Sequence, residues 1–161
     1  MTIRPPAGSK LPEGPCDVLY LSSCGGHLVQ LLKIASHIDK TNSIFVINDR
    51  TDLDSIMQGR TVQITHAERN WKQFLNLIEA FQVVLRYRPK VILSTGAAPA
   101  VPFSIVGRMF GAHIVFVESF SRITAPSLTG KLMYHIAHDF FVQWPKLKER
   151  FPKAHFHGGL L

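Results

Sequence analysis

Residues 18–28 read VLYLSSCGGHL and combine an apolar run, two glycines and a histidine. The apolar residues that follow recur at the spacing of an amphipathic helix; they are Leu28, Leu31, Leu32, Ala35 and Ile38. This pattern predicts a strand over Cys16–Ser23, a tight turn, and a helix over His27–Ile38. Because glycine has no Cβ, the turn can be sharp and a ligand can approach its backbone closely.

Strand-like and helix-like segments alternate along the rest of the chain. Further strands are predicted over Ser43–Asn48, Thr61–Thr65, Lys90–Ser94, His113–Glu118, Phe140–Gln143 and His155–His157. Further helices are predicted over Asp52–Met57, Asn70–Tyr87, Pro99–Phe110, Leu128–Ala137 and Lys146–Glu149. Nearly continuous apolar strands separated by helices are typical of a parallel sheet covered on both faces. We therefore predict an α/β fold with a Rossmann-like parallel sheet and helices on both faces.

The size and composition are those of one globular domain. The chain has 161 residues, of which 46% are hydrophobic and 18% are charged. We expect a single domain over residues 16–161, preceded by a flexible, proline-rich lead-in over residues 1–15. The lead-in lacks the apolar core of a signal peptide, and no stretch approaches the roughly 18–20 apolar residues of a spanning helix. We therefore expect an intracellular protein.

The net charge of the chain limits the classes of partner that it could bind. The net charge is +7, from 18 lysines and arginines against 11 acidic residues. A basic surface suits nucleic acid, an anionic membrane or a phosphate-bearing substrate. We expect no nucleic-acid partner, because no recognition motif is present and the cations are scattered along the sequence. Cys16 and Cys24 bracket one stiff strand, so we expect two free thiols.

Polar residues follow several of the predicted strands. They include His27 after the first strand, Thr95 and Gly96 after the fourth, and Glu118 and Ser119 after the fifth. Functional groups of a parallel sheet gather at the carboxyl ends of its strands, so we expect the site there. The two glycine corners would make a cleft for a diphosphate if they lie side by side.

The first glycine turn does not fit a dinucleotide site. The order Cys-Gly-Gly-His-Leu-Val lacks the third glycine of G-x-G-x-x-G, although Asp49 lies where a ribose-binding acid would end the second strand. Two histidine pairs are closely spaced, His135 with His138 and His155 with His157. Neither pair has a third ligand at a suitable spacing. We therefore expect no cofactor and no metal site.

His27 and Glu118 each allow more than one interpretation. His27 would lie in the first turn of a helix, whose dipole favours a neutral ring that can take a proton from a sugar hydroxyl. Alternatively, it only caps or packs the start of the helix. Glu118 ends a buried strand, where a carboxylate is costly unless it is solvated or hydrogen-bonded. It could bind sugar hydroxyls, act as an alternative base, or tie down the loop Ser119–Thr124.

An apolar segment with basic neighbours suggests a membrane-facing patch. Val101–Phe110 is strongly apolar. Its aromatic and basic companions on the preceding helix and strand are Trp71, Phe74, Lys72, Arg86, Arg88 and Lys90. An apolar patch with a basic rim is the design of an interfacial membrane site. Core packing is the alternative for most of these side chains.

Four motifs in sequence resemble a known enzyme family. They are Ser-Ser-Cys-Gly-Gly-His (22–27), Ser-Thr-Gly-Ala-Ala-Pro-Ala-Val-Pro (94–102), Phe-Val-Glu-Ser-Phe-Ser-Arg (116–122) and Phe-Phe-Val-Gln-Trp-Pro (140–145). In this order they resemble the acceptor-domain subunit of split GT-B glycosyltransferases. That group includes PssD-type exopolysaccharide and capsule proteins and the membrane-anchoring subunit of the dolichol-pathway N-acetylglucosaminyltransferase. A more distant likeness is to the N-terminal half of the MurG-type peptidoglycan transferase.

The resemblance implies roles for individual residues. His27 matches the proposed catalytic histidine of the first glycine loop, and Glu118 matches the glutamate of the segment that lines the cleft. We expect both to be catalytic. Gly25 and Gly26 match the first glycine loop of the family, and Thr95–Pro99 matches its second glycine corner. The residues that we expect to bind the acceptor and its diphosphate are Ser23, Gly25, Gly26, Thr95, Gly96, Ala97 and Ser119. Two features depart from the relatives: the first loop is shorter than the MurG type, with Ser23-Cys24 in place of a Gly-Thr pair, and the eukaryotic membrane helix has no counterpart. Membrane contact would then be peripheral or through a partner.

The resemblance also implies half of a two-domain enzyme, since the second GT-B domain holds most of the sugar nucleotide. We therefore expect a separate donor-binding subunit that presents a UDP-sugar, and a lipid-diphosphate-linked glycan as acceptor. The reaction would be an inverting hexosyl transfer in polysaccharide biosynthesis, in the cytoplasm at the inner face of the cell membrane. Glucuronate, galactose and N-acetylglucosamine donors all occur among similar proteins. The alternatives are a non-catalytic module that recruits the catalytic partner to an anionic membrane surface and, more weakly, a free-standing nucleotide-binding enzyme.

Overall fold

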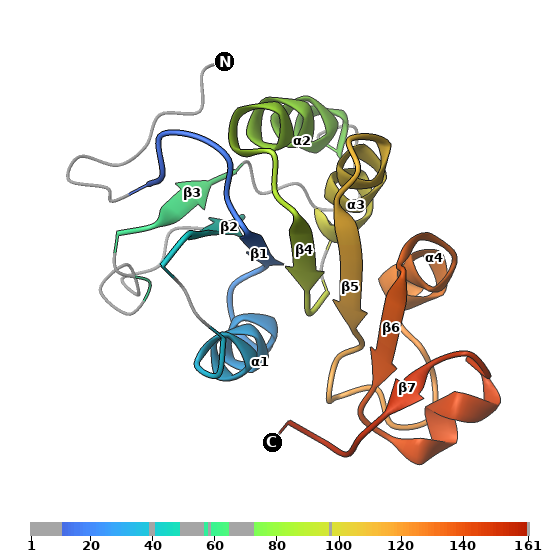
Figure 1. Ribbon diagram of the computed structural model, residues 1–161. Coiled ribbons are helices and arrows are strands. Elements are labelled where there is room, and N and C mark those ends of the chain that lie inside the picture. Colours follow the sequence, from blue (N-terminus) through green and yellow to red (C-terminus); the bar gives the residue numbers. More distant parts are fainter. Residues whose placement is uncertain are drawn as a thin grey trace.

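A seven-stranded parallel sheet forms the centre of the protein (Figure 1). The computed structural model describes residues 11–38, 41–48, 57, 59–64, 73–96 and 98–160. The strands are β1 (Val18–Ser22), β2 (Ser43–Ile47), β3 (Thr61–Gln63), β4 (Val91–Ser94), β5 (His113–Val117), β6 (Asp139–Val142) and β7 (His155–Phe156). The helices are α1 (Gly26–Ala35), α2 (Gln73–Tyr87), α3 (Ala100–Met109), α4 (Leu128–Ile136) and the short 3-10 helix η2 (Pro145–Glu149).

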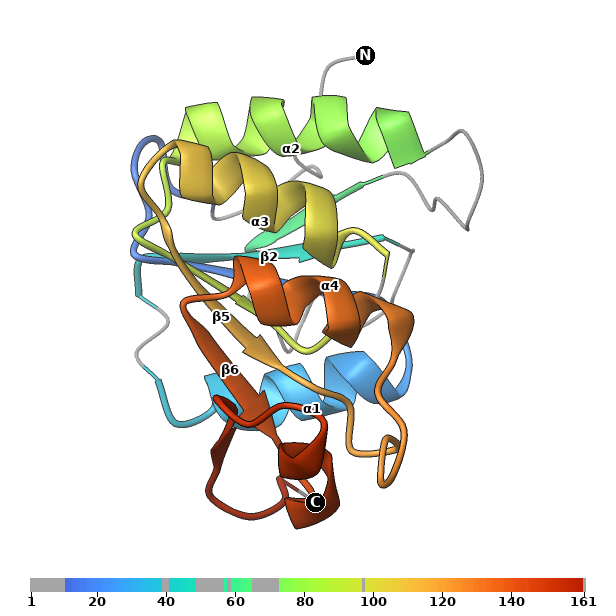
Figure 2. The same cartoon turned by 90° about the vertical axis from the view of Figure 1, so that its right-hand side faces the viewer.

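The helices cover the two faces of the sheet unequally. Helices α2, α3 and α4 lie on one face, and α1 lies on the other (Figures 1 and 2). Alternation along the strands produces a separate core for each face. Leu19 and Leu21 of β1 belong to the core beneath α2, α3 and α4. Tyr20 belongs to the core beneath α1, where its ring stacks on Phe45 with 4.8 Å between the centroids.

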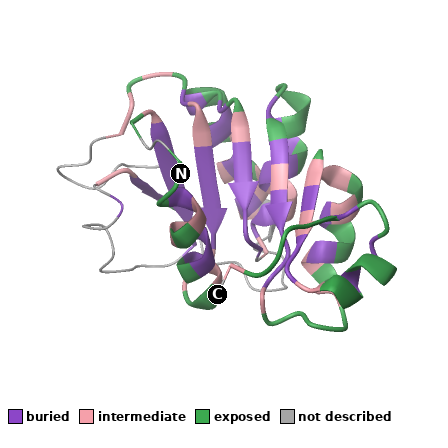
Figure 3. Cartoon of the chain, turned by 60° about the horizontal axis from the view of Figure 1, so that its bottom comes forward, coloured by how far each residue is buried: buried purple, intermediate pink, exposed green. Residues whose placement is uncertain are grey.

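The burial pattern explains why the strands are almost continuously apolar. All five residues of β2 are buried, as are four of the five in β1. Figure 3 shows the sheet buried between its covering layers, with the outward sides of the helices exposed. A sheet with both faces covered has no solvent-facing side on which polar residues could alternate. The prediction of a Rossmann-like parallel sheet with helices on both faces is therefore confirmed.

Most predicted elements are present, with ends shifted by a few residues. The predicted segment 146–149 is a 3-10 helix rather than an α-helix. The helix predicted over Asp52–Met57 lies outside the described residues except for Met57. Asn70, the first residue of the helix predicted over Asn70–Tyr87, also lies outside them. Both cysteines are free thiols, as predicted. No described helix has both the length and the hydrophobicity needed to cross a membrane.

The strand order places β1 beside β4, at the centre of the sheet. The order is β3-β2-β1-β4-β5-β6-β7, so the chain runs outward from β1 to one edge, returns to β4, and continues to the other edge. Leu21 of β1 pairs with Val46 on one side and with Ser94 on the other. The crevice outside such a reversal is where open α/β sheets bind their ligands. It is bordered here by the turns that follow Ser22 and Ser94.

Close packing of α3 on the sheet depends on Gly107, which gives a test of the fold. A Cβ at this position would overlap Cδ1 of Ile92 and lie 3.4 Å from Cδ1 of Ile114. We predict that Gly107→Ala lowers the free energy of unfolding in urea by about 1–3 kcal/mol, because it overpacks the core. Gly14→Ala is the matched control, since its Cβ would meet nothing within 4 Å. The effect should shrink in an Ile92→Val background; equal stability of the two alanine variants would contradict the packing described.

Candidate functional site

The first glycine turn leaves the start of α1 open. Gly25 has φ +89° and ψ −146°, a backbone conformation that strongly favours glycine, and no side chain caps the helix. Gly25 and Gly26 are both exposed, and a Cβ on either would meet nothing within 4 Å. The first N–H groups of a helix have no partner within the helix and carry the positive end of its dipole. This turn therefore borders free space with backbone suited to an anion.

His27 is held by the second glycine corner. Its Nδ1 lies 2.8 Å from the carbonyl oxygen of Thr95, 68 residues away in the sequence. A carbonyl oxygen can only accept a hydrogen bond, so Nδ1 carries the hydrogen and donates it. In the neutral imidazole, Nε2 is then the nitrogen with the free lone pair. A half-buried imidazole in this tautomer can accept a proton from a ligand.

Thr95 fixes His27 a second time through its own side chain. The Thr95 hydroxyl donates to the backbone carbonyl of His27 over 2.8 Å. Thr95 is fully buried, and its hydroxyl also lies 3.4 Å from that of Ser22. The two corners are thus joined by reciprocal hydrogen bonds between one histidine and one threonine. In this structure Thr95 serves to orient His27, and its hydroxyl is not exposed to a ligand.

Gly96 makes room for the imidazole. Its φ is +123°, and an added Cβ would lie 2.8 Å from Cε1 and 2.9 Å from Nδ1 of His27. Real Cβ atoms are essentially never found so close to another heavy atom. Gly96 is therefore required both by the backbone conformation and by the ring that packs on it. Ala97, the next residue of this predicted corner, lies outside the described residues.

Glu118 is enclosed at the end of β5, with an exposed fraction of 1%. Its carboxylate accepts hydrogen bonds from the backbone N–H groups of Ser119, at 2.9 Å, and Ser127, at 3.1 Å. The Ser127 hydroxyl lies 3.0 Å from both carboxylate oxygens. Gly130 allows this approach, since a Cβ there would overlap Oε2 of Glu118. Of the alternatives for Glu118, these contacts favour the one in which it ties down the following loop.

The remaining predicted residues differ in how far a ligand could reach them. Ser23 is half-buried beside the first glycine turn. Ser119 has an exposed fraction of 6%, and its hydroxyl lies 3.0 Å from that of Ser121. Asp49, considered for a ribose hydroxyl, lies outside the described residues. Across the part of the chain that the structure describes, no group of three or more potential metal ligands comes together.

Two buried glutamines connect α1 to the end of β6, and the sequence did not predict that they pair. Gln30 follows His27 on α1, and Gln143 follows β6; the Gln143 amide donates to Oε1 of Gln30 over 2.6 Å. Their exposed fractions are 3% and 4%. A glutamine within the apolar stripe of the predicted first helix was the available signal for Gln30. Gln143 lies at the end of a predicted strand, but nothing in the sequence indicates that its amide bonds Gln30.

Comparison with known proteins shows the family to which the chain belongs. The model of the family described as "Oligosaccharide biosynthesis protein Alg14 like" matches residues 41–160. The chain belongs to this family. A mouse protein named UDP-N-acetylglucosamine transferase subunit ALG14 is 26% identical, over 93% of this chain and 85% of its own length. Its Yarrowia lipolytica counterpart is 26% identical over 89% of this chain and 67% of its own length.

Solved structures support the fold of this Alg14-like chain. Acinetobacter baumannii MurG superposes with a TM-score of 0.66 at 15% identity, over 82% of this chain and 43% of MurG. A UDP-N-acetylglucosamine 2-epimerase from Rickettsia bellii superposes with a TM-score of 0.70 at 15% identity, over 91% of this chain and 45% of the epimerase. The chain thus spans less than half of each structure. The resemblance to split GT-B enzymes is confirmed at the level of family and fold.

The hydrogen bonds between His27 and Thr95, which join the two glycine corners, can be tested with Gly96→Ala. We predict that the added Cβ displaces the imidazole and breaks its hydrogen bond to Thr95, because the ring lies within 2.9 Å of that position. Nitrogen NMR of the ring should report the loss of the Nδ1–H tautomer. Gly25→Ala is the control: its φ of +89° is also strained, but its Cβ would meet nothing within 4 Å. An unchanged tautomer in Gly96→Ala would refute the geometry given for His27.

Proposed function

We propose that this Alg14-like chain is the acceptor-binding subunit of a two-component inverting glycosyltransferase. A separate subunit would bind the UDP-sugar, and this chain would bind a lipid-diphosphate-linked glycan. The ALG14 relatives, which are named as subunits of a UDP-N-acetylglucosamine transferase, support the glycosyltransferase assignment. The observation that carries the proposal is the 2.8 Å contact between His27 Nδ1 and the Thr95 carbonyl, because in the neutral ring it leaves Nε2 as a proton acceptor next to the exposed glycine turn.

In the proposed reaction, Nε2 of His27 takes the proton of the acceptor hydroxyl. The hydroxyl oxygen forms its new bond to the anomeric carbon of the sugar while the bond from that carbon to UDP breaks. The electron pair of the broken bond leaves with UDP, and attack from the opposite side inverts the anomeric configuration. A general base of this kind contributes roughly 10²–10⁴-fold to the rate. Holding donor and acceptor together supplies a further large share through proximity.

The glycine corners are proposed to receive the diphosphate of the acceptor. Helices α1 and α3 both begin at the crevice between β1 and β4, and neither has a side-chain cap. By contrast, α4 is capped by Ser127, whose hydroxyl accepts from the N–H of Gly130. Uncapped helix starts present free N–H groups and a positive dipole end to an anion. Ser23, Gly25 and Gly26 would contact the diphosphate from the α1 side. Gly96 itself is buried and its N–H donates to the Ser94 hydroxyl over 3.2 Å, so the α3 side would contribute through the start of the helix.

Removing His27 is the direct test. We predict that His27→Ala lowers transfer by about 10²–10⁴-fold, because the acceptor hydroxyl loses its base. The assay uses the complex with the partner subunit that co-purifies, a polyprenyl-diphosphate-linked monosaccharide, and UDP-N-acetylglucosamine, UDP-galactose and UDP-glucuronate in turn. His37→Ala is the control, since His37 lies exposed just beyond α1. Near-normal transfer by His27→Ala in an intact complex would favour the recruiting module instead.

Membrane contact is proposed for an apolar ridge on the outer side of α2 and α3. The exposed large apolar residues of this ridge are Ile78, Leu85, Ile105, Met109 and Phe110. The two helices are joined by an edge contact between the rings of Phe81 and Phe110, with centroids 6.2 Å apart. Arg86, Arg88 and Arg108 are exposed beside the ridge. Exposed apolar side chains flanked by arginines fit an anionic lipid surface.

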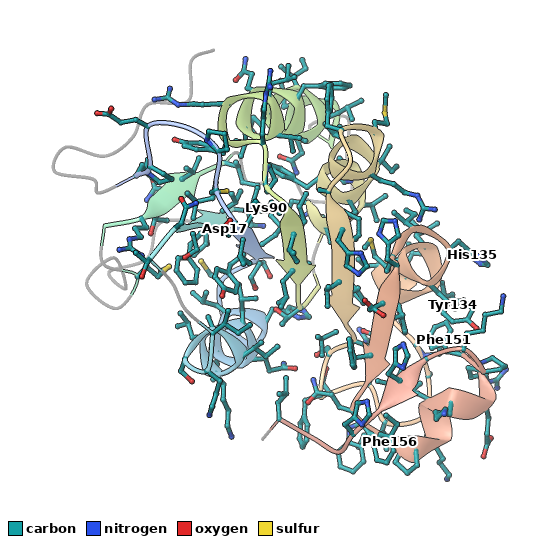
Figure 4. The ribbon with its side chains drawn as sticks, in the orientation of Figure 1. Asp17, Lys90, Tyr134, His135, Phe151 and Phe156 are labelled. Carbon is teal, nitrogen blue, oxygen red and sulfur yellow. The ribbon has the colours of Figure 1, made fainter. Side chains whose placement is uncertain are left out.

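The structure changes the membrane patch expected from the sequence. Trp71 and Lys72 lie outside the described residues, as does the side chain of Phe74. Lys90 forms an ion pair with Asp17, with 2.8 Å between Nζ and Oδ1 (Figure 4). Several residues of Val101–Phe110 are core residues, among them Phe103 and Val106. The ridge is therefore narrower than the sequence suggested and has arginines as its cations.

We predict that Met109→Ser combined with Phe110→Ser weakens binding to vesicles of phosphatidylglycerol and phosphatidylcholine by about tenfold. These side chains have exposed fractions of 67% and 50%, and their transfer into lipid would be lost. Cosedimentation with the vesicles measures the effect. Val29→Ser is the control, because Val29 is 55% exposed on α1, across the sheet from the ridge. Equal binding by both variants would remove the ridge as the contact surface.

A further inference from the structure

The loop over residues 119–127 is held by buried side chains at both ends. At its start, the N–H of Phe120 donates to Oε1 of Gln30 over 3.0 Å, and the carbonyl of Phe120 accepts from Nε1 of Trp144 over 2.6 Å. The rings of Phe120 and Trp144 pack with centroids 5.0 Å apart. At its end, Ser127 is fixed by the carboxylate of Glu118. Both ends are therefore anchored to neighbouring elements.

Gln30 and Gln143 are the centre of this anchorage. Gln30 Nε2 donates to the carbonyl of Gly26 over 3.1 Å, so the same side chain bonds the glycine turn and the loop. Gln143 Nε2 donates to Gln30 and also to the carbonyl of Glu118, at 2.9 Å. Gln143 Oε1 accepts from the N–H of Leu160 over 3.0 Å. The pair thus joins α1, β5, β6 and the loop through contacts that use the hydrogen-bonding atoms of both amides.

The main effect of such a network is to fix the positions of the elements that it joins, and its net contribution to the stability of the fold is small. A buried hydrogen-bonded amide pair contributes little net free energy compared with apolar side chains of the same volume, but it accepts few alternative arrangements. The middle of the loop, residues 121–125, is exposed and carries Arg122 together with Ile123, whose exposed fraction is 49%. Buried polar groups therefore fix a loop whose middle faces solvent and whose first residues share Gln30 with the glycine turn.

We propose that Gln30 is a positioning residue, which with Gln143 fixes loop 119–127 against the glycine turn so that residues 121–125 form one wall of the acceptor site. The inference rests on the proposed function, because it assigns the loop to the acceptor. Gln30 acts through the backbone of Gly26 and Phe120 and does not touch the reacting atoms. Its contribution appears in how well the acceptor is held relative to His27, where small displacements cost much of the rate.

The experiment compares Gln30→Met with Gln30→Glu in the complete complex. Methionine keeps the volume but removes all three hydrogen bonds of Gln30, whereas glutamate keeps an oxygen that accepts from Phe120 and Gln143. We expect Gln30→Met to raise the KM for the polyprenyl-diphosphate-linked monosaccharide by about tenfold, with the KM for the UDP-sugar unchanged. Gln30→Glu should recover part of this loss, because it keeps the contacts with Phe120 and Gln143 but cannot donate to the carbonyl of Gly26. Lys33→Met, an exposed substitution on the same helix, is the control.

Two further measurements on the isolated full-length chain keep the inference testable if the complex transfers no sugar. Hydrogen exchange of the Phe120 amide should accelerate about tenfold in Gln30→Met and not in Lys33→Met, with amides of the sheet unchanged. Titration with farnesyl diphosphate should shift the amide signals of residues 25–27 and 121–125 together in the wild type, with weaker binding in Gln30→Met.

The outcomes separate the two proposals. A wild-type complex that does not transfer sugar would overturn the proposed function, and the farnesyl diphosphate titration would then decide the positioning role alone. A complex that transfers normally with Gln30→Met, at an unchanged acceptor KM, would overturn the positioning role and leave the proposed function intact.

Discussion

The reciprocal hydrogen bonds between His27 and Thr95 are the constraint on which the candidate site depends. They join the turns that follow β1 and β4, at the place where the strand order reverses, through two residues that are 68 positions apart in the sequence. One of these bonds sets the tautomer of the imidazole, and the other fixes the backbone that carries it. Since Thr95 is fully buried, neither bond competes with water on the threonine side. The site is therefore preorganised before any ligand arrives.

A second set of buried polar contacts surrounds the hydrogen-bonded pair His27 and Thr95. The carboxylate of Glu118 and the amides of Gln30 and Gln143 lie at the carboxyl edge of the sheet, with exposed fractions of 1–4%. Each would destabilise the fold by about 1–3 kcal/mol if a partner were lost and it stayed unsatisfied. Because these partners come from α1, the loop and the end of β6, the shape of the edge depends on the whole sheet being formed. Folding and site formation are therefore coupled.

The sequence was enough to predict the fold because its signals are local. Apolar runs predict strands, helical spacing predicts helices, and their alternation predicts a parallel sheet, with strand ends that the structure changes by only a few residues. The position of His27 in the first turn of the helix after the first strand was also predicted from the sequence. The hydrogen-bond partners of the buried polar side chains could not be predicted in this way. Nothing near Gln30 indicates that its amide meets Gln143, 113 residues later, and the enclosure of Glu118 depends on a loop conformation.

The helix starts at the crevice depart from the rules that stabilise helices elsewhere in the chain. Helix α4 has the favoured arrangement, with Ser127 as its cap, whereas α1 begins at a glycine with φ +89° and α3 at Pro99, both without a side-chain cap. A missing cap costs a helix about 0.5–2 kcal/mol, and glycine adds an entropic cost. These two helix starts lie on either side of the hydrogen-bonded pair His27 and Thr95, and uncapped N–H groups are what the proposed diphosphate would need. Sites commonly break local rules that the rest of a fold obeys, because a group that is satisfied internally cannot bind a ligand.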